Sequence, residues 1–130
     1  MPRKRRYYKG KRVSRGELKI AEVLDKNNID FIQEHSFADL VSKKGNRLRF
    51  DFFISDFNLV IEYQGQHHYR PVNKHRRAQR THKLAVLHDS LKMQYCDRNH
   101  IRILRIPYEN YDRIEEVLNI IINAFNKNKY

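Results

Sequence analysis

Apolar and polar residues alternate in two neighbouring stretches near the middle of the chain. In residues 47–54, RLRFDFFI, every second side chain is apolar, which is the period of a β-strand with one buried face. Residues 55–58, SDFN, are typical of a turn, and residues 59–64, LVIEYQ, resume the alternation. The pattern predicts a β-hairpin with Asp51 and Glu62 on adjacent strands, about 5 Å apart. Its first strand buries Leu48, Phe50, Phe52 and Ile54 on one face.

Other stretches follow a helical period. Ser14-Arg15-Gly16-Glu17 has the form of a capping box and predicts a helix that ends at Asn27-Asn28. Apolar residues recur at helical spacing in residues 81–98 and 111–126, which predicts two more helices. We expect further strands at residues 30–37 and 101–106, the second ended by a proline, and a polar turn at residues 42–46.

These elements predict an α/β fold with one small sheet and helices packed on it. A chain of 130 residues is long enough for one domain with a substantial core. We assign this domain to residues 14–126. A basic flexible arm over residues 1–13 precedes it, and a frayed tail over residues 127–130 follows.

The net positive charge of the chain indicates which class of molecule it binds. Lys and Arg number 27 against 15 Asp and Glu, which gives a formal net charge of +12 and a pI near 10. Such an excess favours nucleic acid as the partner, whereas no apolar run approaches the ~18 residues of a membrane span. The first residues lack the apolar core of a signal peptide, and Cys96 has no second cysteine for a disulfide or a multi-cysteine zinc site. We therefore expect an intracellular, cytoplasmic protein.

Two segments concentrate the positive charge. The first is the arm, whose tyrosines are suited to stack on bases, and the second is the stretch 63–88, which contains no acidic residue. We expect both to contact phosphates, the second as a loop that clamps the backbone. Alternatives are a localisation or solubilising role for the arm, a solvated loop, or zinc binding by the loop histidines, which have no Cys partner nearby. The expected nucleic-acid contacts are Arg3, Lys4, Arg5, Arg6, Lys11, Arg12, Arg70, Lys74, Arg76, Arg77, Arg80 and Lys83.

The carboxylates of Asp51 and Glu62 are candidate metal ligands. Two carboxylates so close repel each other unless a cation lies between them or one holds a proton. Mg²⁺ is commonly held by one or two carboxylates together with water and phosphate oxygens. The pair therefore indicates a metal site that faces a polyanion. The alternative is that both are solvated strand residues paired with Arg47 or Arg49.

Asp51, then Glu62-Tyr63-Gln64-Gly65, then His68 resemble the core of the PD-(D/E)XK nuclease superfamily. Within it, the chain is most similar to the branch of the very-short-patch-repair endonucleases and the phage homing endonucleases with a Glu/Asp/His/Asp signature. The likeness extends through residues 88–92 (HDSLK), 95–96 and 103–108 (ILRIPY), and covers roughly residues 14–125. It implies an αβββαβα, restriction-endonuclease-like core in which a small central mixed sheet is flanked by helices.

The resemblance also implies roles for individual residues in a metal-dependent DNA endonuclease of a phage or bacterium. Asp51 would hold Mg²⁺ or Mn²⁺, with help from Glu62 or from a main-chain carbonyl beside Gln64. His68 would act as general base, because an imidazole takes up a proton near neutral pH. The remaining roles fall to Glu17 and Asp89, which would orient the water, the base or a second cation. Lys92 or arginines of the loop over residues 70–80 would stabilise charge on the phosphate.

Each of these roles has a simpler alternative. Glu17 has a capping role available, and Asp89 and Lys92 have the spacing of an i,i+3 ion pair. His68 is also suited to stack on Tyr69, or to exchange roles with its neighbour His67.

The chain departs from the superfamily pattern at Gln64, which stands where the tripeptide has lysine. Glutamine offers hydrogen bonds but no positive charge. This favours a histidine-based mechanism and leaves open a catalytically inactive nucleic-acid-binding protein. Among active enzymes, a Holliday-junction or other structure-specific nuclease is the alternative to one that nicks or cuts duplex DNA. A homodimer or a partner protein would then supply specificity.

Overall fold

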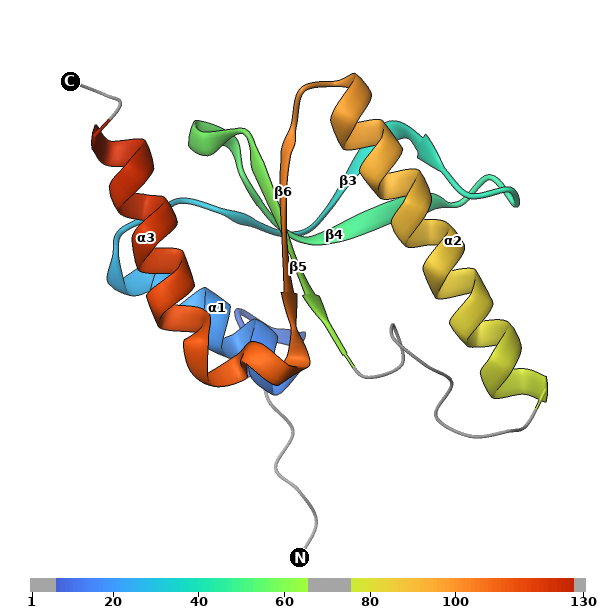
Figure 1. Ribbon diagram of the computed structural model, residues 1–130, viewed down its shortest axis with the longest axis horizontal. Coiled ribbons are helices and arrows are strands. Elements are labelled where there is room, and N and C mark those ends of the chain that lie inside the picture. Colours follow the sequence, from blue (N-terminus) through green and yellow to red (C-terminus); the bar gives the residue numbers. More distant parts are fainter. Residues whose placement is uncertain (1–6, 66–75, 128–130) are drawn as a thin grey trace, which may run out of the picture. The chain divides into compact units, whose positions relative to one another are not determined.

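The computed structural model describes residues 7–65 and 76–127. The chain forms two compact units, residues 31–108 and residues 1–30 with 109–130, and each is described by itself. The order of elements is αβββαβα after a short N-terminal hairpin (Figure 1). The elements are β1 (Tyr7–Tyr8), β2 (Lys11–Arg12), α1 (Arg15–Lys26), β3 (Ile32–Val41), β4 (Arg47–Ile54), η1 (Ser55–Phe57), β5 (Leu59–Gln64), α2 (Arg76–Arg98), β6 (Arg102–Pro107), η3 (Tyr108–Arg113) and α3 (Ile114–Lys127).

The larger unit is built on a four-stranded mixed sheet in the order β3-β4-β5-β6. The first three strands are antiparallel, and β5 and β6 are parallel because α2 carries the chain across between them (Figure 1). The α/β class and the hairpin β4–β5 are confirmed. In that hairpin Phe52 pairs with Ile61 and Ile54 with Leu59, while Asn58 takes the left-handed conformation that closes the turn.

Helix α2 packs on this sheet through a cluster of buried side chains. Its residues Tyr95 and Cys96 are buried against Phe50 of β4 and Val60 of β5. Tyr95 also donates a hydrogen bond to Asp39 Oδ1 at 2.7 Å, so its hydroxyl is satisfied inside the cluster. The cluster thereby fixes the face that α2 presents to the sheet. Its other members are Leu40 and Leu48, with Phe37, Phe53, Leu91, Ile101 and Ile103 packed against them.

Burial alternates along β4 as predicted, but the aromatic rings near Asp51 do not keep to the two faces of a regular strand. The ring of Phe37 contacts both Phe50, at 5.9 Å between centroids, and Phe53, at 5.5 Å. These two rings lie three positions apart, whereas side chains on one face of a regular strand lie two or four apart. All four predicted apolar positions of β4 are nevertheless buried. The irregularity falls at the candidate metal ligand, where the pairing of β4 with β5 also ends.

The smaller unit contains the N-terminal hairpin, α1 and α3. Helix α1 begins at the predicted Ser14 cap and ends at Lys26, and α3 buries Ile114, Leu118 and Ile122 at helical spacing. Arg15 lies over the ring of Tyr111 at 3.6 Å from its centroid. Two lysines of α1, Lys19 and Lys26, pair with Glu115 of α3, the second at 2.8 Å. Both helices were predicted.

Some predicted boundaries were wrong. Residues 76–80, expected in a loop, form the first turns of α2, because arginine, alanine and glutamine are good helix formers and no proline interrupts them. Strand β3 runs to Val41 rather than residue 37, since the turn at residues 42–46 closes a longer hairpin with β4. Within the arm, residues 7–12 form the hairpin β1–β2, and Tyr8 donates a hydrogen bond to Asp25.

Among the helices that the structure describes, none combines the length and the hydropathy of a bilayer-spanning segment.

Candidate functional site

A buried ion pair joins β5 to α2. Lys92 Nζ lies 2.5 Å from Glu62 Oε1, and the two side chains are 13% and 9% exposed. The ammonium group also lies 5.3 Å from the centre of the Phe50 ring, so it has an aromatic neighbour as well as an anionic one. Glu62 is therefore not the solvated strand carboxylate of the simpler alternative. Nor is Lys92 committed to Asp89, since its short ion pair crosses from the helix to the sheet.

Asp51 lies in the middle of β4, next to the last residue of that strand that pairs with β5. The β4–β5 pairing begins at Phe52 and Ile61, and continuing this register by one residue places Asp51 opposite Glu62. Asp51 Oδ2 accepts a hydrogen bond of 2.8 Å from the backbone N–H of Tyr63. The carboxylate thus binds the adjacent strand just past its last backbone pair. Two predicted metal ligands, Asp51 and Glu62, are brought to neighbouring positions.

Gln64 and Asp89 meet beside this pair. Gln64 Nε2 lies 3.5 Å from Asp89 Oδ2, a long hydrogen bond between the end of β5 and the middle of α2. Arg105 Nη2 of β6 donates to the Asp89 carbonyl at 2.7 Å, and Arg105 is also the β6 partner of Glu62 in the parallel ladder. The structure therefore groups Glu62, Gln64, Asp89 and Lys92 on facing parts of β5 and α2.

Sequence reasoning missed two residues of this group, Arg105 and Cys96. The Nε atom of Arg105 is buried and has no hydrogen-bond partner among the described residues. The signal that could have found it is a cation between Leu104 and Ile106 in the interior of β6. Cys96 lies one turn after Lys92. Burial raises the pKa of its thiol to about 11, opposed in part by the charges of Arg105 and Lys92 and supported by that of Glu62. The thiol is therefore neutral, a packing group rather than a nucleophile.

Glu17 belongs to the other unit, where it completes the capping box. Ser14 Oγ accepts a hydrogen bond from the Glu17 backbone N–H at 3.2 Å and donates one to Glu17 Oε1 at 2.9 Å. The capping role is thus confirmed, through the Ser14 hydroxyl rather than its backbone amide. The metal-proximal role of Glu17 stays a prediction.

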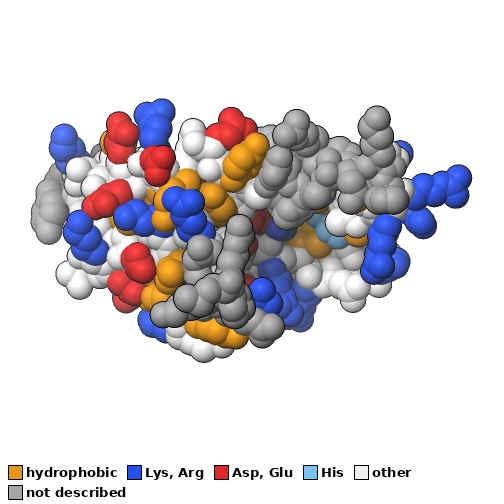
Figure 2. Space-filling model, turned by 90° about the horizontal axis from the view of Figure 1, so that it is seen from below, with side chains coloured by type: hydrophobic (Ala, Val, Ile, Leu, Met, Phe, Trp, Pro, Cys, Tyr) orange, Lys and Arg blue, Asp and Glu red, His pale blue; other side chains and the backbone are white. Residues whose placement is uncertain are grey.

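The predicted cationic surface is partly described. Arg76, Arg77, Arg80 and Lys83 are exposed on the first turns of α2, and Figure 2 shows Lys and Arg side chains gathered on the right, where Figure 1 places the start of that helix. Lys11 and Arg12 are exposed on β2. His67 and His68 lie outside the described residues, as do the predicted contacts Arg3, Lys4, Arg5, Arg6, Arg70 and Lys74.

The described side chains fit a metal ion held by few protein ligands. No group of three or more His, Cys, Asp or Glu side chains suited to a metal occurs in residues 7–65 and 76–127. Mg²⁺ nevertheless needs only one or two carboxylates when water and phosphate supply its other oxygens. Asp51 and Glu62 supply that number, from strands that hold them side by side. Gln64 adds an amide oxygen at the end of the same strand.

No protein-family model matches this chain, and neither a curated protein nor a solved structure is significantly similar to it.

Proposed function

We propose that this chain is a divalent-metal-dependent endodeoxyribonuclease that hydrolyses phosphodiester bonds, with a restriction-endonuclease-like core. The order αβββαβα and the mixed sheet are compatible with that core. The net charge of +12 and the exposed cations of α2 favour a polyanionic substrate.

The observation that carries the proposal is the position of the Glu62–Lys92 pair beside Asp51. Withdrawing two charges from water costs more than their attraction commonly returns, so a buried ion pair is weak evidence for a purely stabilising role. Charged groups held in fixed positions away from water are instead suited to stabilise charge that develops during a reaction. The pair occupies the positions that the resemblance to the nuclease superfamily assigns to catalysis.

In this proposal Asp51 and Glu62 hold Mg²⁺ or Mn²⁺, and the oxygen atoms near Gln64 complete the protein ligands. Such an ion would lower the pKa of a bound water and neutralise charge on the scissile phosphate. Asp89 orients the Gln64 amide by accepting a hydrogen bond from its Nε2. His68, outside the described residues, keeps its predicted role as general base that removes a proton from the attacking water.

Lys92 would supply the charge that Gln64 lacks. The superfamily tripeptide places its lysine two residues after the acidic residue, and here that position is a neutral amide. The Lys92 ammonium lies within 2.5 Å of the same acidic residue, Glu62, although it comes from α2 rather than β5. A cation at this place is suited to stabilise the additional negative charge of a phosphoryl transition state.

A catalytically inactive DNA-binding protein is the second candidate. It is favoured by the contacts that already engage both carboxylates, since Lys92 neutralises Glu62 and the Tyr63 amide binds Asp51. Such a protein would use the cations of α2 and need no metal. Among active enzymes, a Holliday-junction or other structure-specific nuclease remains the alternative to one that cuts duplex DNA.

The test is cleavage of supercoiled plasmid by the purified protein with Mg²⁺, Mn²⁺ or EDTA. Asp51→Asn is the sharpest variant, because asparagine keeps an oxygen to accept the Tyr63 hydrogen bond but loses the charge. We expect metal-dependent nicking or linearisation by the wild type and a loss of at least about 100-fold in Asp51→Asn.

The matched control is Asp56→Asn, an equivalent change at an exposed residue of η1. It should cleave like the wild type, and all three proteins should shift DNA on a gel. Full activity in Asp51→Asn would refute the metal site. DNA binding without cleavage by the wild type, tested also on branched and single-stranded substrates, would favour the inactive binder.

A further inference from the structure

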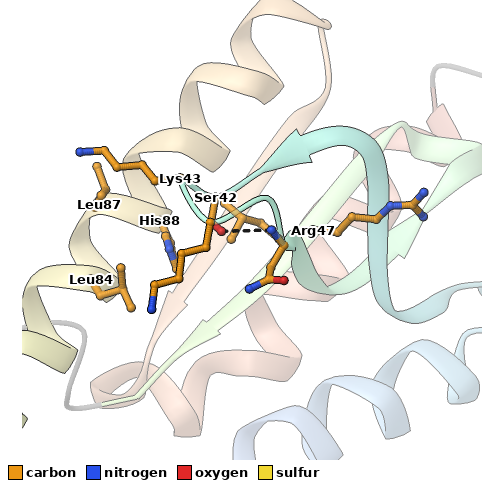
Figure 3. A pocket seen from close by; sticks show the side chains of 9 residues that line it. Ser42, Lys43, Arg47, Leu84, Leu87 and His88 are labelled. Carbon is orange, nitrogen blue, oxygen red and sulfur yellow. Dashed lines mark hydrogen bonds between the residues drawn. The ribbon is translucent and has the colours of Figure 1, made fainter.

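A cavity of about 510 Å³ lies between the β3–β4 turn and helix α2. Such a volume falls within the range of about 300–1,000 Å³ that small-molecule sites occupy. Figure 3 shows Leu84, Leu87 and His88 on the α2 side, facing the turn that carries Ser42 and Lys43. The cavity belongs wholly to the larger unit, and it involves none of the proposed metal ligands.

The lining combines an apolar surface with positive charge. Leu48 of β4 and the two leucines of α2 supply the apolar part, and Lys43 and Lys44 of the turn supply the charge. None of the described side chains that line the cavity is acidic. Arg47 also borders it, but Figure 3 shows its side chain extending away from the leucines.

The turn that carries the lysines is held in shape before any ligand binds. The Ser42 backbone N–H donates to the Asn46 carbonyl at 2.8 Å, and the Asn46 N–H donates to Ser42 Oγ at 3.3 Å. Gly45 sits between them at φ +84°, a conformation that few other residues adopt readily. The lysines therefore extend from a fixed backbone, and the Ser42 hydroxyl and the Asn46 amide offer hydrogen bonds at the cavity wall.

We propose that this cavity binds a single unpaired nucleotide of a DNA substrate, its base against the leucines and its phosphate against Lys43 and Lys44. A base inside a duplex is stacked on both faces and has no apolar face to offer, whereas a bulged or flipped base does. Leu84 is 52% exposed, so an apolar surface is open to receive one. The inference rests on the proposed DNA binding, but not on cleavage.

The charge around the cavity favours a nucleotide over an acidic peptide. Along α2, the turns before Leu84 carry Arg76, Arg80 and Lys83, which line a second cavity of about 360 Å³ with Gln79. Cations therefore continue from the first cavity along the helix, as an extended phosphate backbone requires. An acidic peptide would need only a local patch of cations, not a row of them along the helix.

The experiment uses two DNA hairpins that contain 2-aminopurine, one with the analogue in a single-nucleotide bulge and one with it fully paired. The protein contains no tryptophan, so the fluorescence of the analogue can be excited selectively. Binding is measured with EDTA present, for the wild type, Leu84→Ser and Met93→Ser. Met93 is the matched control because it is 50% exposed on the same helix and does not line the cavity.

We expect the wild type to bind the bulged hairpin about tenfold more tightly than the paired one, with a rise in fluorescence as the base leaves the stack. Leu84→Ser should lose most of this preference, and Met93→Ser should keep it. Equal affinity of the wild type for both hairpins would overturn the proposal, as would an undiminished preference in Leu84→Ser. So would Leu84-dependent binding of an acidic leucine-containing peptide without any preference between the hairpins.

Failure of the pocket and failure of the nuclease proposal give different results. Metal-dependent plasmid cleavage without a preference for the bulged hairpin would refute the nucleotide-binding cavity and support the nuclease. A Leu84-dependent preference for the bulged hairpin, in a protein that cleaves no DNA with either metal, would refute the nuclease and support the nucleotide-binding cavity.

Discussion

Replacing Lys92 by methionine should destabilise the protein by about 3 kcal/mol, the lower end of the range for removing one partner of a buried ion pair. Methionine keeps an unbranched side chain against the Phe50 ring and removes only the charge. Glu62 would then be left 9% exposed, without the ammonium that lies 2.5 Å away in the wild type. The lower end applies because neither side chain is completely withdrawn from solvent.

A second ion pair of the same protein provides the matched control. Lys26 and Glu115 lie 2.8 Å apart, but their side chains are 71% and 40% exposed. Solvent screens exposed pairs, which contribute little to stability, so Lys26→Met should cost far less than Lys92→Met. The double variant Glu62→Gln, Lys92→Met should recover most of the loss, because it removes both buried charges.

Urea unfolding followed by circular dichroism gives the free energy of unfolding of each variant. A cost for Lys92→Met as small as that for Lys26→Met would refute the reasoning, since it would mean that Glu62 is hydrated in the folded protein. A double variant as unstable as Lys92→Met would show that the loss comes from packing rather than from the unpaired charge.

The variant Lys92→Met also tests the metal site, without any assay of activity. Once Lys92 is gone, a bound Mg²⁺ or Mn²⁺ would compensate the charge of Glu62, and an ion at 100 times its dissociation constant stabilises the folded state by about 2.7 kcal/mol. We expect Lys92→Met to gain more stability from the metal than the wild type does. The double variant Asp51→Asn, Lys92→Met should not be stabilised by the metal. Stabilisation equal to that of Lys92→Met would show that Asp51 is not a metal ligand.

Two further predictions concern the stability of the two units. Ser14→Ala removes the cap of α1 and should cost about 1 kcal/mol in urea unfolding, whereas Ser90→Ala, an exposed serine within α2, should cost much less. Burial raises the pKa of Tyr95 from 10.0 to about 12, with its hydrogen bond to Asp39 as the next cause, and raises that of Cys96 from 9.0 to about 11. The unfolded chain loses these protons first, so stability should be complete below pH 9 and fall as the pH rises towards 12. In unfolding measured over this range, Tyr95→Phe should weaken the loss above pH 10, and a pH dependence equal to that of the wild type would contradict this account.

The hairpin β4–β5 could be predicted from the sequence because its information is local. Alternating apolar residues set the strands, and Asn58 closes the turn in a conformation that asparagine adopts more readily than most residues. The start of α2 could not be predicted in the same way. The sequence of residues 76–80 is compatible with a helix by propensity, but it has no apolar period and reads equally as a basic loop.

In the candidate site too, contacts within the hairpin could be predicted and contacts between distant segments could not. The neighbouring positions of Asp51 and Glu62 follow from the register of one hairpin, so they could be predicted from the sequence. The partner of Lys92 did not follow, because 30 residues separate it from Glu62 and the contact depends on how α2 rotates about its axis. Arg105 was missed for a related reason, since its neighbours are set by a parallel crossover rather than by a turn.

The charges of the assembled group bear on the choice between a nuclease and an inactive binder. Among the described side chains of this group, the three carboxylates of Asp51, Glu62 and Asp89 outnumber the two cations of Lys92 and Arg105, in a protein whose formal net charge is +12. These carboxylates repel a phosphodiester, and a metal ion bound by them would offset that repulsion. A protein that only binds DNA gains nothing from such repulsion, and replacing Asp51 by asparagine would strengthen its binding. In a metal-dependent nuclease, the same carboxylates attract the metal ion. Asp51→Asn therefore distinguishes the two functions, because it would strengthen DNA binding by an inactive binder and abolish cleavage by a nuclease.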